Sequence, residues 1–318
     1  MAQTKINPLL SLCIPIFNRL PYLERQLKRF LEDKELFNNQ IELIISDNCS
    51  SDDLLSCCKT FSRMGLNLTY HRNETNIGPE GNFDWCFQHS SGKYVWLLGS
   101  DDIPKPGILH KILDVLKQED YGLVHLSMNK QPKELVIYNT LDEILVAVSY
   151  WITYISANII STQFVKQFDL SKYIGSYLMQ VPAYINACRL CPNNAILYLP
   201  SFFEEDNDTK NNGGLNLFEV FVTNLFGMYE CYVERGELSV EAFDKIKKVE
   251  FIEFLSCRVV WVLIFKTSKN YHTEGSWKIL WKYYGTKMYA YCNLFHMILR
   301  EIRIKVSKRL RSSYKVHG

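Results

Sequence analysis

The first half of the chain alternates between short apolar runs and longer segments with helical periodicity. The near-continuous apolar run LLSLCIPIF at 9–17 is typical of a strand buried on both faces. Pro21 then opens a segment in which Leu23, Leu27 and Phe30 recur at the spacing of one helix face, predicting a helix over 21–37. Further strands are expected at 41–46, 66–72, 93–98 and 121–128, and helices at 53–61, 82–90 and 106–118.

This alternation predicts an α/β fold with a mostly parallel, doubly wound sheet. Ligands of such sheets lie beyond the carboxyl ends of the strands, at a point where the strand order reverses. Polar clusters follow three of the predicted strands: NR after the first, SDNCSSDD after the second and GSDD after the fourth. We therefore expect these clusters to meet at one edge of the sheet and to form the site.

Beyond residue 130 the alternation weakens. Strands are expected at 152–161 and 195–203 and helices at 174–190 and 215–233, and from about 240 the chain is helical and rich in aromatic residues. The uncharged stretch 144–165 is long enough to span a bilayer, but its seven polar side chains favour a helix end followed by a buried strand. The predicted domains are 1–235, with halves 9–130 and 131–235, and a helical C-terminal region, 236–318, with a basic tail.

Charge and cysteine content narrow the class of protein. The net charge is +2, and the segment 300–318 carries seven Lys/Arg against one acid, or +6, so the remainder carries −4. A mildly acidic body with a basic end excludes a typical nucleic-acid-binding face. The ten scattered cysteines and a start without a secretory signal predict free thiols in the cytoplasm. Cys188 and Cys191 form a CxxC without a second pair, which favours a structural role over a metal site.

Asp101 and Asp102 end the apolar strand in KYVWLLGSDD, where burial of two adjacent charges is costly. One interpretation is a solvated turn with Asp102 as a helix cap. Ile103 and Pro104 follow at once, however, and they favour a carboxylate pair held rigidly between a strand and a turn. One or two carboxylates plus substrate phosphates are the usual ligands of Mg²⁺, and Mn²⁺ suits the same oxygens. The predicted partner of the pair is a divalent cation that carries a diphosphate.

Four motifs in order carry a family resemblance: SLCIPIFNR, ISDNCSSDD, NIGPEGNF and GKYVWLLGSDDIPKPGIL. They resemble the family-2 glycosyltransferases of the GT-A (Rossmann-like) fold, most of all the bacterial O-antigen, capsule and other surface-glycan enzymes of the abequosyltransferase-like group. The resemblance covers 9–130 well and 150–225 loosely. It implies a metal-dependent hexosyl- or deoxyhexosyltransferase that uses a nucleotide-sugar donor and a growing, lipid-linked glycan acceptor, with inversion as the expected stereochemistry.

The resemblance also implies roles for individual residues. Pro15 and Asn18 would lie along the nucleotide, and Asp47 would accept a hydrogen bond from the base. Asn76, Gly78 and Asn82 would belong to the loop and helix that close over the donor. Asp101 would lie near the ribose and the metal, and Asp102 would be the principal metal ligand. Taken singly, Asp47 and the loop at 76–78 could equally form simple turns.

Two departures from the family pattern stand out. Many members have an Asp-x-Asp motif, and here Gly99 stands at its first position. The family also supplies its base from a Glu-Asp pair on a helix before the strand that corresponds to AILYLP, but no acid lies between Leu170 and Phe203. Asp206 or Glu205 is the candidate base, although EEDND at 204–208 has the alternative of a solvated charge run. His110 and His125 are weaker candidates because both fall in apolar-periodic segments.

The C-terminal region leaves two interpretations open. Apolar and aromatic residues interleaved with Arg and Lys can lie in an anionic membrane interface, or the helix can pack on the catalytic domain with its basic face solvated. The resemblance to enzymes with lipid-linked acceptors favours a peripheral location on the inner face of the cytoplasmic membrane.

Two other functions compete with glycosyl transfer. The missing acid motivates a non-catalytic protein of the same fold that binds nucleotide-sugar or membrane. A sugar-1-phosphate nucleotidyltransferase would also place a metal-bound nucleotide on an α/β sheet. Such enzymes have a Gly-rich basic loop after the first strand, and FNRLPYL contains no glycine.

Overall fold

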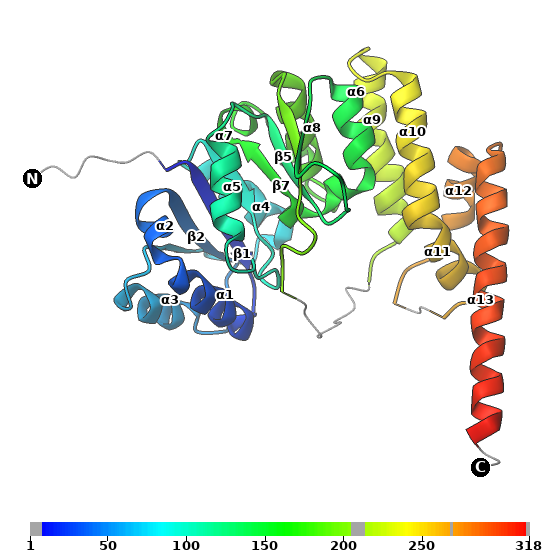
Figure 1. The fold of residues 1–318 in the computed structure, drawn as a ribbon, viewed down its shortest axis with the longest axis horizontal. Coiled ribbons are helices and arrows are strands. Elements are labelled where there is room, and N and C mark those ends of the chain that lie inside the picture. The colour runs from blue at the N-terminus through cyan, green and yellow to red at the C-terminus, as the bar shows by residue number, and fades with distance from the viewer. Residues whose placement is uncertain (1–7, 205–213, 268–269, 316–318) are drawn as a thin grey trace, which may run out of the picture. The chain divides into compact units, whose positions relative to one another are not determined.

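The computed structural model describes residues 8–204, 214–267 and 270–315, with side chains described as far as residue 307. The chain divides into two compact units, Met1–Thr209 and Lys210–Gly318, each of which is described by itself (Figure 1). The division falls at 209 and not at the predicted boundary of 235. The helical segment expected at 215–233 therefore belongs to the C-terminal unit.

Unit 1 (Met1–Thr209) is built on one mixed sheet with the strand order β3-β2-β1-β4-β7-β5-β8-β6. β1 pairs in parallel with β2 and β4, and β2 pairs in parallel with β3. β7 runs antiparallel to β4 and β5, and β6 runs antiparallel to β8. The mostly parallel sheet is confirmed. The strands are β1 Leu10–Ile16, β2 Ile41–Asp47, β3 Thr69–Arg72, β4 Tyr94–Leu97, β5 Leu123–Ser127, β6 Leu135–Tyr138, β7 Asn158–Ser161 and β8 Asn194–Tyr198.

Helices cover both faces of this sheet. Leu12 of β1, Leu27 of α1 and Ile112 of α5 belong to one buried core cluster. On the opposite face α4 and α8 meet, with the rings of Phe87 and Tyr184 edge to face at 6.5 Å. The helices are α1 Leu20–Glu32, α2 Lys34–Asn39, α3 Leu54–Arg63, α4 Gly78–His89, α5 Ile108–Leu116, α6 Leu141–Val148, α7 Thr162–Val165 and α8 Gln180–Leu190, with 3₁₀ turns η1 Ser149–Thr153, η2 Ile155–Ala157 and η3 Ser171–Tyr173.

The uncharged stretch at 144–165 folds as expected. It holds the end of α6, the turns η1 and η2, the fully buried strand β7 and the short helix α7. In the parts of the chain that the structure describes, no helix combines the length and the apolar character needed to cross a membrane.

Unit 2 (Lys210–Gly318) is helical and rich in aromatic contacts, as predicted for the C-terminal region. Phe251 and Tyr284 lie with ring centroids 4.5 Å apart, and Phe226 packs edge to face on Phe243 at 5.7 Å. Its helices are α9 Leu225–Glu234, α10 Val240–Glu250, α11 Ser256–Arg258, α12 Ser276–Tyr284 and α13 Met288–Lys315, with π-helical segments η4 Glu219–Asn224, η5 Phe251–Leu255 and η6 Val259–Ile264.

Glu250, the last residue of α10, is a buried acid. It has no exposed surface, and neither carboxyl oxygen has a hydrogen-bond partner among the described residues. Burial raises the pKa of Glu250 well above its ordinary value, because an unpaired carboxylate is poorly solvated there. Glu250 is therefore protonated in the folded unit at pH values where the unfolded chain has lost that proton.

Because folded Glu250 keeps this proton to higher pH than the unfolded chain does, the free energy of unfolding falls as pH rises. The contribution of this proton is complete below the unfolded pKa of Glu250 and is lost progressively as pH rises through the folded pKa. We expect Glu250→Gln to stabilise the chain by about 1–3 kcal/mol at pH 8 and to change little at pH 4.5. Thermal unfolding at both pH values measures this, with the exposed Glu253→Gln as the matched control. An equal effect of Glu250→Gln at both pH values would contradict it.

Candidate active site

The turn after β4 presents the paired carboxylates at the carboxyl edge of the sheet. β1 to β4 are mutually parallel, so their carboxyl ends share this edge. The Asp102 N–H donates to the Gly99 carbonyl at 3.0 Å. The buried Gln26 of α1 donates its Nε2 protons to the carbonyls of both Gly99 and Asp102, each at 2.8 Å. The first helix therefore holds both ends of the turn in place.

The Asp102 carboxylate is partly buried and anchored on one side. The Tyr154 hydroxyl donates to its Oδ1 at 2.7 Å. Burial raises the pKa of Asp102, the negative charge of Asp101 raises it further, and hydrogen bonds from Ser156 and Tyr154 lower it without cancelling the increase. A cation beside this carboxylate would stabilise its ionised form.

Asp101 has a positive partner from the chain itself. Arg19, which follows β1, places a guanidinium nitrogen 3.0 Å from Asp101 Oδ2 and donates to Ser100 Oγ at 3.3 Å. Both side chains of the ion pair are more than a third exposed, so the pair stabilises the fold little. Of the two negative charges predicted to need a cation, that of Asp101 is therefore already paired with Arg19.

The remaining oxygens of both carboxylates lie close beside Gly99. A Cβ built on Gly99 would lie 2.8 Å from Asp102 Oδ2, 3.1 Å from Asp101 Oδ1 and 3.2 Å from Ser156 Oγ. Oxygens of both carboxylates and of Ser156 therefore come together beside Gly99, and oxygen ligands suit a hard divalent cation. The same distances explain the departure at residue 99, since a side chain there would force the Asp102 carboxylate to move.

Across the described residues, no group of three or more His, Cys, Asp or Glu side chains could hold a metal by itself. The carboxylate pair therefore fits a metal only if other ligands, such as donor phosphates and water, complete its coordination.

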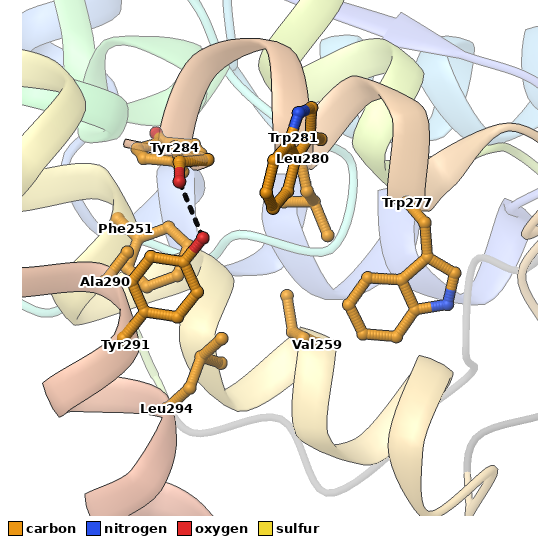
Figure 2. Close-up of a pocket in the computed structure, with 10 residues that line it drawn as sticks. Phe251, Val259, Trp277, Leu280, Trp281, Tyr284, Ala290, Tyr291 and Leu294 are labelled. Atoms are coloured by element: carbon orange, nitrogen blue, oxygen red, sulfur yellow. Dashed lines mark hydrogen bonds between the residues drawn. The ribbon is translucent and has the colours of Figure 1, made fainter. Parts of the chain in front are cut away.

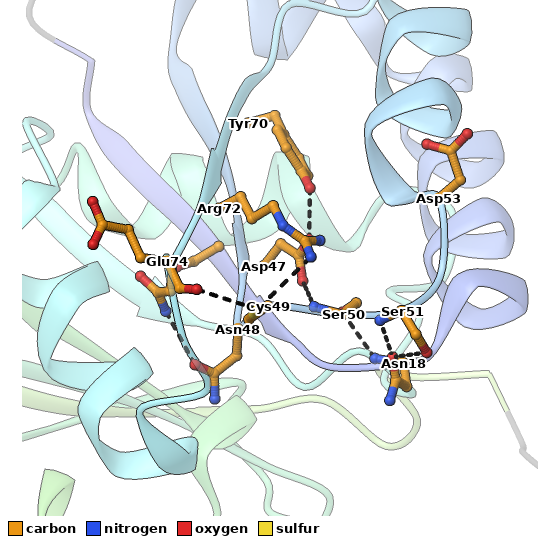
Figure 3. A network of polar contacts seen from close by, with 12 residues as sticks. Asn18, Asp47, Asn48, Cys49, Ser50, Ser51, Asp53, Tyr70, Arg72 and Glu74 are labelled. Atoms are coloured by element: carbon orange, nitrogen blue, oxygen red, sulfur yellow. Dashed lines mark hydrogen bonds and ion pairs between the residues drawn. The ribbon is translucent and has the colours of Figure 1, made fainter.

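Asp47 ends β2 and is completely buried in a polar network (Figure 3). Its Oδ2 accepts hydrogen bonds from the Tyr70 hydroxyl at 2.6 Å and from Arg72 at 2.8 Å, and its Oδ1 accepts one from the Ser50 N–H at 2.8 Å. Burial alone would raise the pKa of Asp47, but the hydrogen bonds and the Arg72 charge lower it below its ordinary value. Asp47 is thus a fixed carboxylate that orders the loop behind it and holds the 44% exposed Arg72 side chain.

Pro15 and Asn18 lie at the end of β1, beside this loop. Pro15 pairs with Ser46 of β2 in the strand register. Asn18 adopts a left-handed backbone with φ +51°, which asparagine tolerates better than most residues. Its Oδ1 accepts from the Ser51 N–H at 2.7 Å, and its own N–H donates to Ser50 Oγ at 3.0 Å (Figure 3). Asn18 therefore ties the two polar clusters together.

Asn76, Gly78 and Asn82 lie at the start of α4, beside the same edge. Asn76 Oδ1 accepts from the Asn48 side chain and from the Gly78 N–H, both at 2.9 Å. Gly78 has φ +77°, a conformation that favours glycine. Asn82 is buried, donates to the Ser46 carbonyl at 2.9 Å and accepts from the Ser46 hydroxyl at 2.6 Å. Asn82 therefore anchors α4 to β2, while Asn76 and Gly78 shape the loop.

The structure thus brings together, at one sheet edge, all the residues predicted to bind the donor and the metal. A family model described as Glycosyl transferase family 2 matches residues 11–179, more than half of the chain, and contains all of these residues. The chain belongs to glycosyl transferase family 2.

Two of the curated relatives are named as bacterial glycosyltransferases. The chain is 39% identical over 95 residues to abequosyltransferase RfbV of Salmonella typhimurium, covering 30% of this chain and 28% of the relative. It is 29% identical over 123 residues to a GalNAc(5)-diNAcBac-PP-undecaprenol beta-1,3-glucosyltransferase of Campylobacter jejuni, covering 38% of each. These matches span well under half of either relative.

Solved structures agree in fold over nearly the whole chain. The S. aureus TarS 1–349 structure in complex with UDP has a TM-score of 0.58 at 12% identity and covers 92% of this chain and 91% of that one. The mannosyltransferase PcManGT from Pyrobaculum calidifontis, in complex with GDP-Man and Mn²⁺, has a TM-score of 0.54 at 13% identity and covers 94% and 88%. At this level of identity the likeness establishes the family's GT-A fold.

The candidate bases Glu205 and Asp206 lie outside the described residues. The last described residue before them, Glu204, donates its N–H to the Ile103 carbonyl at 2.9 Å. The chain therefore passes directly beside the carboxylate turn just before it reaches the two candidates.

Neither the start of α8 nor His125 on β5 supplies a general base. Gln180 opens α8, the helix before β8 on which the family's acids are expected, and an amide cannot accept a proton at neutral pH. Its Nε2 donates to the Thr153 carbonyl at 3.2 Å, and its buried Oε1 has no hydrogen-bond partner among the described residues. His125 is buried in β5 beside Asn158, and burial lowers the pKa of His125 to about 4.

Sequence reasoning missed four side chains that organise this site. Arg19 and Arg72 stand inside or beside the quoted motifs, but nothing local shows that they pair with Asp101 and Asp47. Tyr154 lies in the uncharged stretch and carries no signal at all.

Glu80 is the fourth missed residue. Its carboxylate accepts hydrogen bonds from the N–H of Gly175 at 2.6 Å and of Met179 at 3.2 Å. Glu80 therefore ties the start of α4 to the segment before α8.

Proposed function

We propose that this chain transfers a hexose or deoxyhexose from a nucleotide-sugar to a growing bacterial surface glycan. The observation that carries the proposal is the set of carboxylate oxygens of Asp101 and Asp102 that come together beside Gly99, at the sheet edge where Asp47, Asn18 and the loop at 76–78 also meet. Ligands of doubly wound sheets bind at such an edge.

Asp102 and Asp101 are the proposed ligands of a divalent cation, Mn²⁺ or Mg²⁺, with the donor diphosphate completing its coordination. When bound, the cation would neutralise negative charge on the departing nucleoside diphosphate. Arg19 holds one oxygen of Asp101 and leaves the other beside Gly99. Tyr154 does the same for Asp102.

Tyr154→Phe should weaken metal binding without abolishing it. Without the hydroxyl, Asp102 Oδ1 loses its hydrogen bond with Tyr154 and the carboxylate can turn away from Asp101. Loss of a residue that orients a metal ligand typically costs 10–100-fold in metal affinity, and we expect a shift of about that size in the half-saturating Mn²⁺ concentration. Titration followed by Mn²⁺ electron paramagnetic resonance measures this. The control is Tyr198→Phe on β8, and an unchanged titration of Tyr154→Phe would contradict the role.

The donor-binding roles follow the same contacts. Asp47 is the proposed acceptor for the nucleotide base; its carboxylate already accepts from Tyr70, Arg72 and Ser50 and has no exposed surface, so the base would have to displace one of these partners. Pro15 and Asn18 would line the nucleotide, Asp101 would lie near the ribose, and Asn76 and Gly78 would close over the donor on the anchor made by Asn82.

For the acceptor half we propose Asp206 or Glu205 as the base that takes the proton of the acceptor hydroxyl, with inversion at the anomeric carbon. We also propose a lipid-linked acceptor, met at the cytoplasmic face of the membrane. The support is the named undecaprenol-linked substrate of the Campylobacter relative and the basic, amphipathic C-terminal helix.

A thermal-shift screen of UDP-, GDP-, CDP- and dTDP-sugars, each with and without Mn²⁺, tests the donor site. One nucleotide class should raise the melting temperature, and only when metal is present. At a ligand concentration a hundredfold above its Kd, the free energy of unfolding should rise by about 2.7 kcal/mol. If no nucleotide shifts the wild-type chain, the donor site is refuted.

The absence of an acid on α8 favours one alternative, a binding protein without turnover. It predicts the same metal-dependent donor shift with no sugar transfer and no donor hydrolysis. Transfer or hydrolysis that disappears in Asp102→Ala would exclude it.

A further inference from the structure

Unit 2 contains an apolar pocket of about 260 Å³ between α12 and α13. Figure 2 shows Trp277 and Trp281 along one side, Tyr291 and Leu294 on the other, and Val259 between them. The Tyr291 hydroxyl donates to the Gly285 carbonyl at 2.6 Å, so it presents no free polar group to the pocket. A pocket with this lining fits hydrocarbon rather than a sugar or a nucleotide.

The two tryptophans are unusually open to solvent for their size. Trp277 is 55% exposed and Trp281 is 70% exposed. The Trp281 ring lies close against Gly285, where a Cβ would come 2.5 Å from the Trp281 carbonyl oxygen and 2.8 Å from the ring, so this approach requires glycine. Large aromatic side chains held out at a pocket of this kind mark an interaction surface.

The pocket continues into an apolar stripe along α13. Met288, Tyr291, Phe295, Leu299, Ile302 and Val306 follow one another at steps of three or four residues, and their exposed fractions run from 38% to 73%. Steps of this kind place all six on one face of the helix.

The opposite face of α13 packs on its own unit. Ala290 is buried, the Trp261 indole donates to Glu301 at 3.2 Å, and the Lys305 ammonium lies 3.8 Å from the centre of the Phe265 ring. The apolar stripe therefore points away from the rest of unit 2.

Positive charge accompanies this surface. Lys278 and Lys282 each follow one of the two tryptophans, and Arg300 and Arg303 each follow a residue of the stripe; all four are exposed. The segment 300–318 carries +6 in sequence. Two copies of the chain that paired along this end of the helix would bring these like charges together. An anionic surface would be attracted to them.

We propose that the α12–α13 surface, defined by Trp277, Trp281 and the apolar stripe, docks on an anionic phospholipid bilayer and that the pocket takes the end of one acyl chain. Tryptophan and tyrosine suit the boundary between headgroups and hydrocarbon, and each basic side chain near such a surface adds attraction to anionic lipid. The proposal deepens the membrane-face location proposed above and rests on it, but it needs neither donor nor metal.

Sedimentation of the full-length chain with phosphatidylcholine vesicles, with and without phosphatidylglycerol, tests the docking. The wild type should bind vesicles that contain phosphatidylglycerol, and Arg300→Gln with Arg303→Gln should weaken this binding roughly 30-fold. Trp281→Ala should weaken it at least about tenfold, and the exposed Val240→Ser, outside the surface, should leave it unchanged. Lipids brominated in the acyl chain should quench tryptophan fluorescence in the wild type and much less in Trp281→Ala.

The proposal is overturned if the wild type ignores anionic vesicles, if the basic and tryptophan variants bind like Val240→Ser, or if Phe295→Ser dissociates a dimer in solution. Melting temperatures of the variants identify any that fail to fold. If a tryptophan variant does not fold, vesicle binding by the folded Arg300→Gln/Arg303→Gln variant still tests whether basic side chains contribute to docking. The donor-plus-Mn²⁺ thermal shift should be the same in all variants. Its loss in the wild type would count against the donor site and not against docking.

Discussion

An Asp102→Ala chain is expected to transfer sugar about 10²–10³-fold more slowly than the wild type. The substitution removes one of the two carboxylates whose oxygens come together beside Gly99. Asp101 would remain, but Arg19 already holds one of its oxygens. Initial rates of transfer over a range of Mn²⁺ concentrations measure the effect, and the metal-dependent donor shift should disappear in parallel.

This loss should not come from unfolding. Burial raises the pKa of Asp102, so its ionised form is disfavoured in the folded chain and its removal should cost little stability at neutral pH. The control is Asp114→Ala on α5, an exposed acid of the same unit. A rate for Asp102→Ala within tenfold of the wild type, with the same Mn²⁺ requirement, would contradict the metal role of this carboxylate.

The fold was predictable where strands are long or buried. β1 and β2 are near-continuous apolar runs, and the sequence places them within one or two residues of their observed bounds. β6 was missed because Leu135–Tyr138 is a four-residue edge strand whose partner, β8, lies some sixty residues away. The helix expected over 21–37 breaks at Asp33 into α1 and α2, and no glycine or proline marks that break.

The site residues that could be predicted are those that stand in short sequence motifs. Asp47, Asn76, Gly78 and the carboxylate pair stand in short motifs at strand ends, and parallel strands bring such ends together. The partners that orient these groups come from far along the chain, as Tyr154 does for Asp102 and Gly175 for Glu80. Pattern and spacing contain no information on such pairings.

Asp206→Asn or Glu205→Gln is expected to slow transfer by about 10²–10⁴-fold, the usual contribution of a general base. The acceptor hydroxyl must lose a proton, and α8 offers only the amide of Gln180 at its start. The chain reaches these two acids directly after Glu204, whose N–H is bonded to the Ile103 carbonyl beside the carboxylate pair. Transfer rates at saturating donor, with the donor-plus-Mn²⁺ thermal shift measured on the same samples, separate chemistry from binding.

The two isosteric variants serve as controls for each other. Glu204→Gln is a third control at the neighbouring acid, whose carboxylate lies 3.7 Å from the Arg25 guanidinium. A base acts only when it reaches the acceptor hydroxyl, so one variant should lose transfer while the others stay within about threefold of the wild type. The donor shift should remain in all three, because the proposed donor ligands are untouched. A solvated charge run predicts instead three small and similar effects, and that result would leave the family-2 chain with a donor site and no base from this segment.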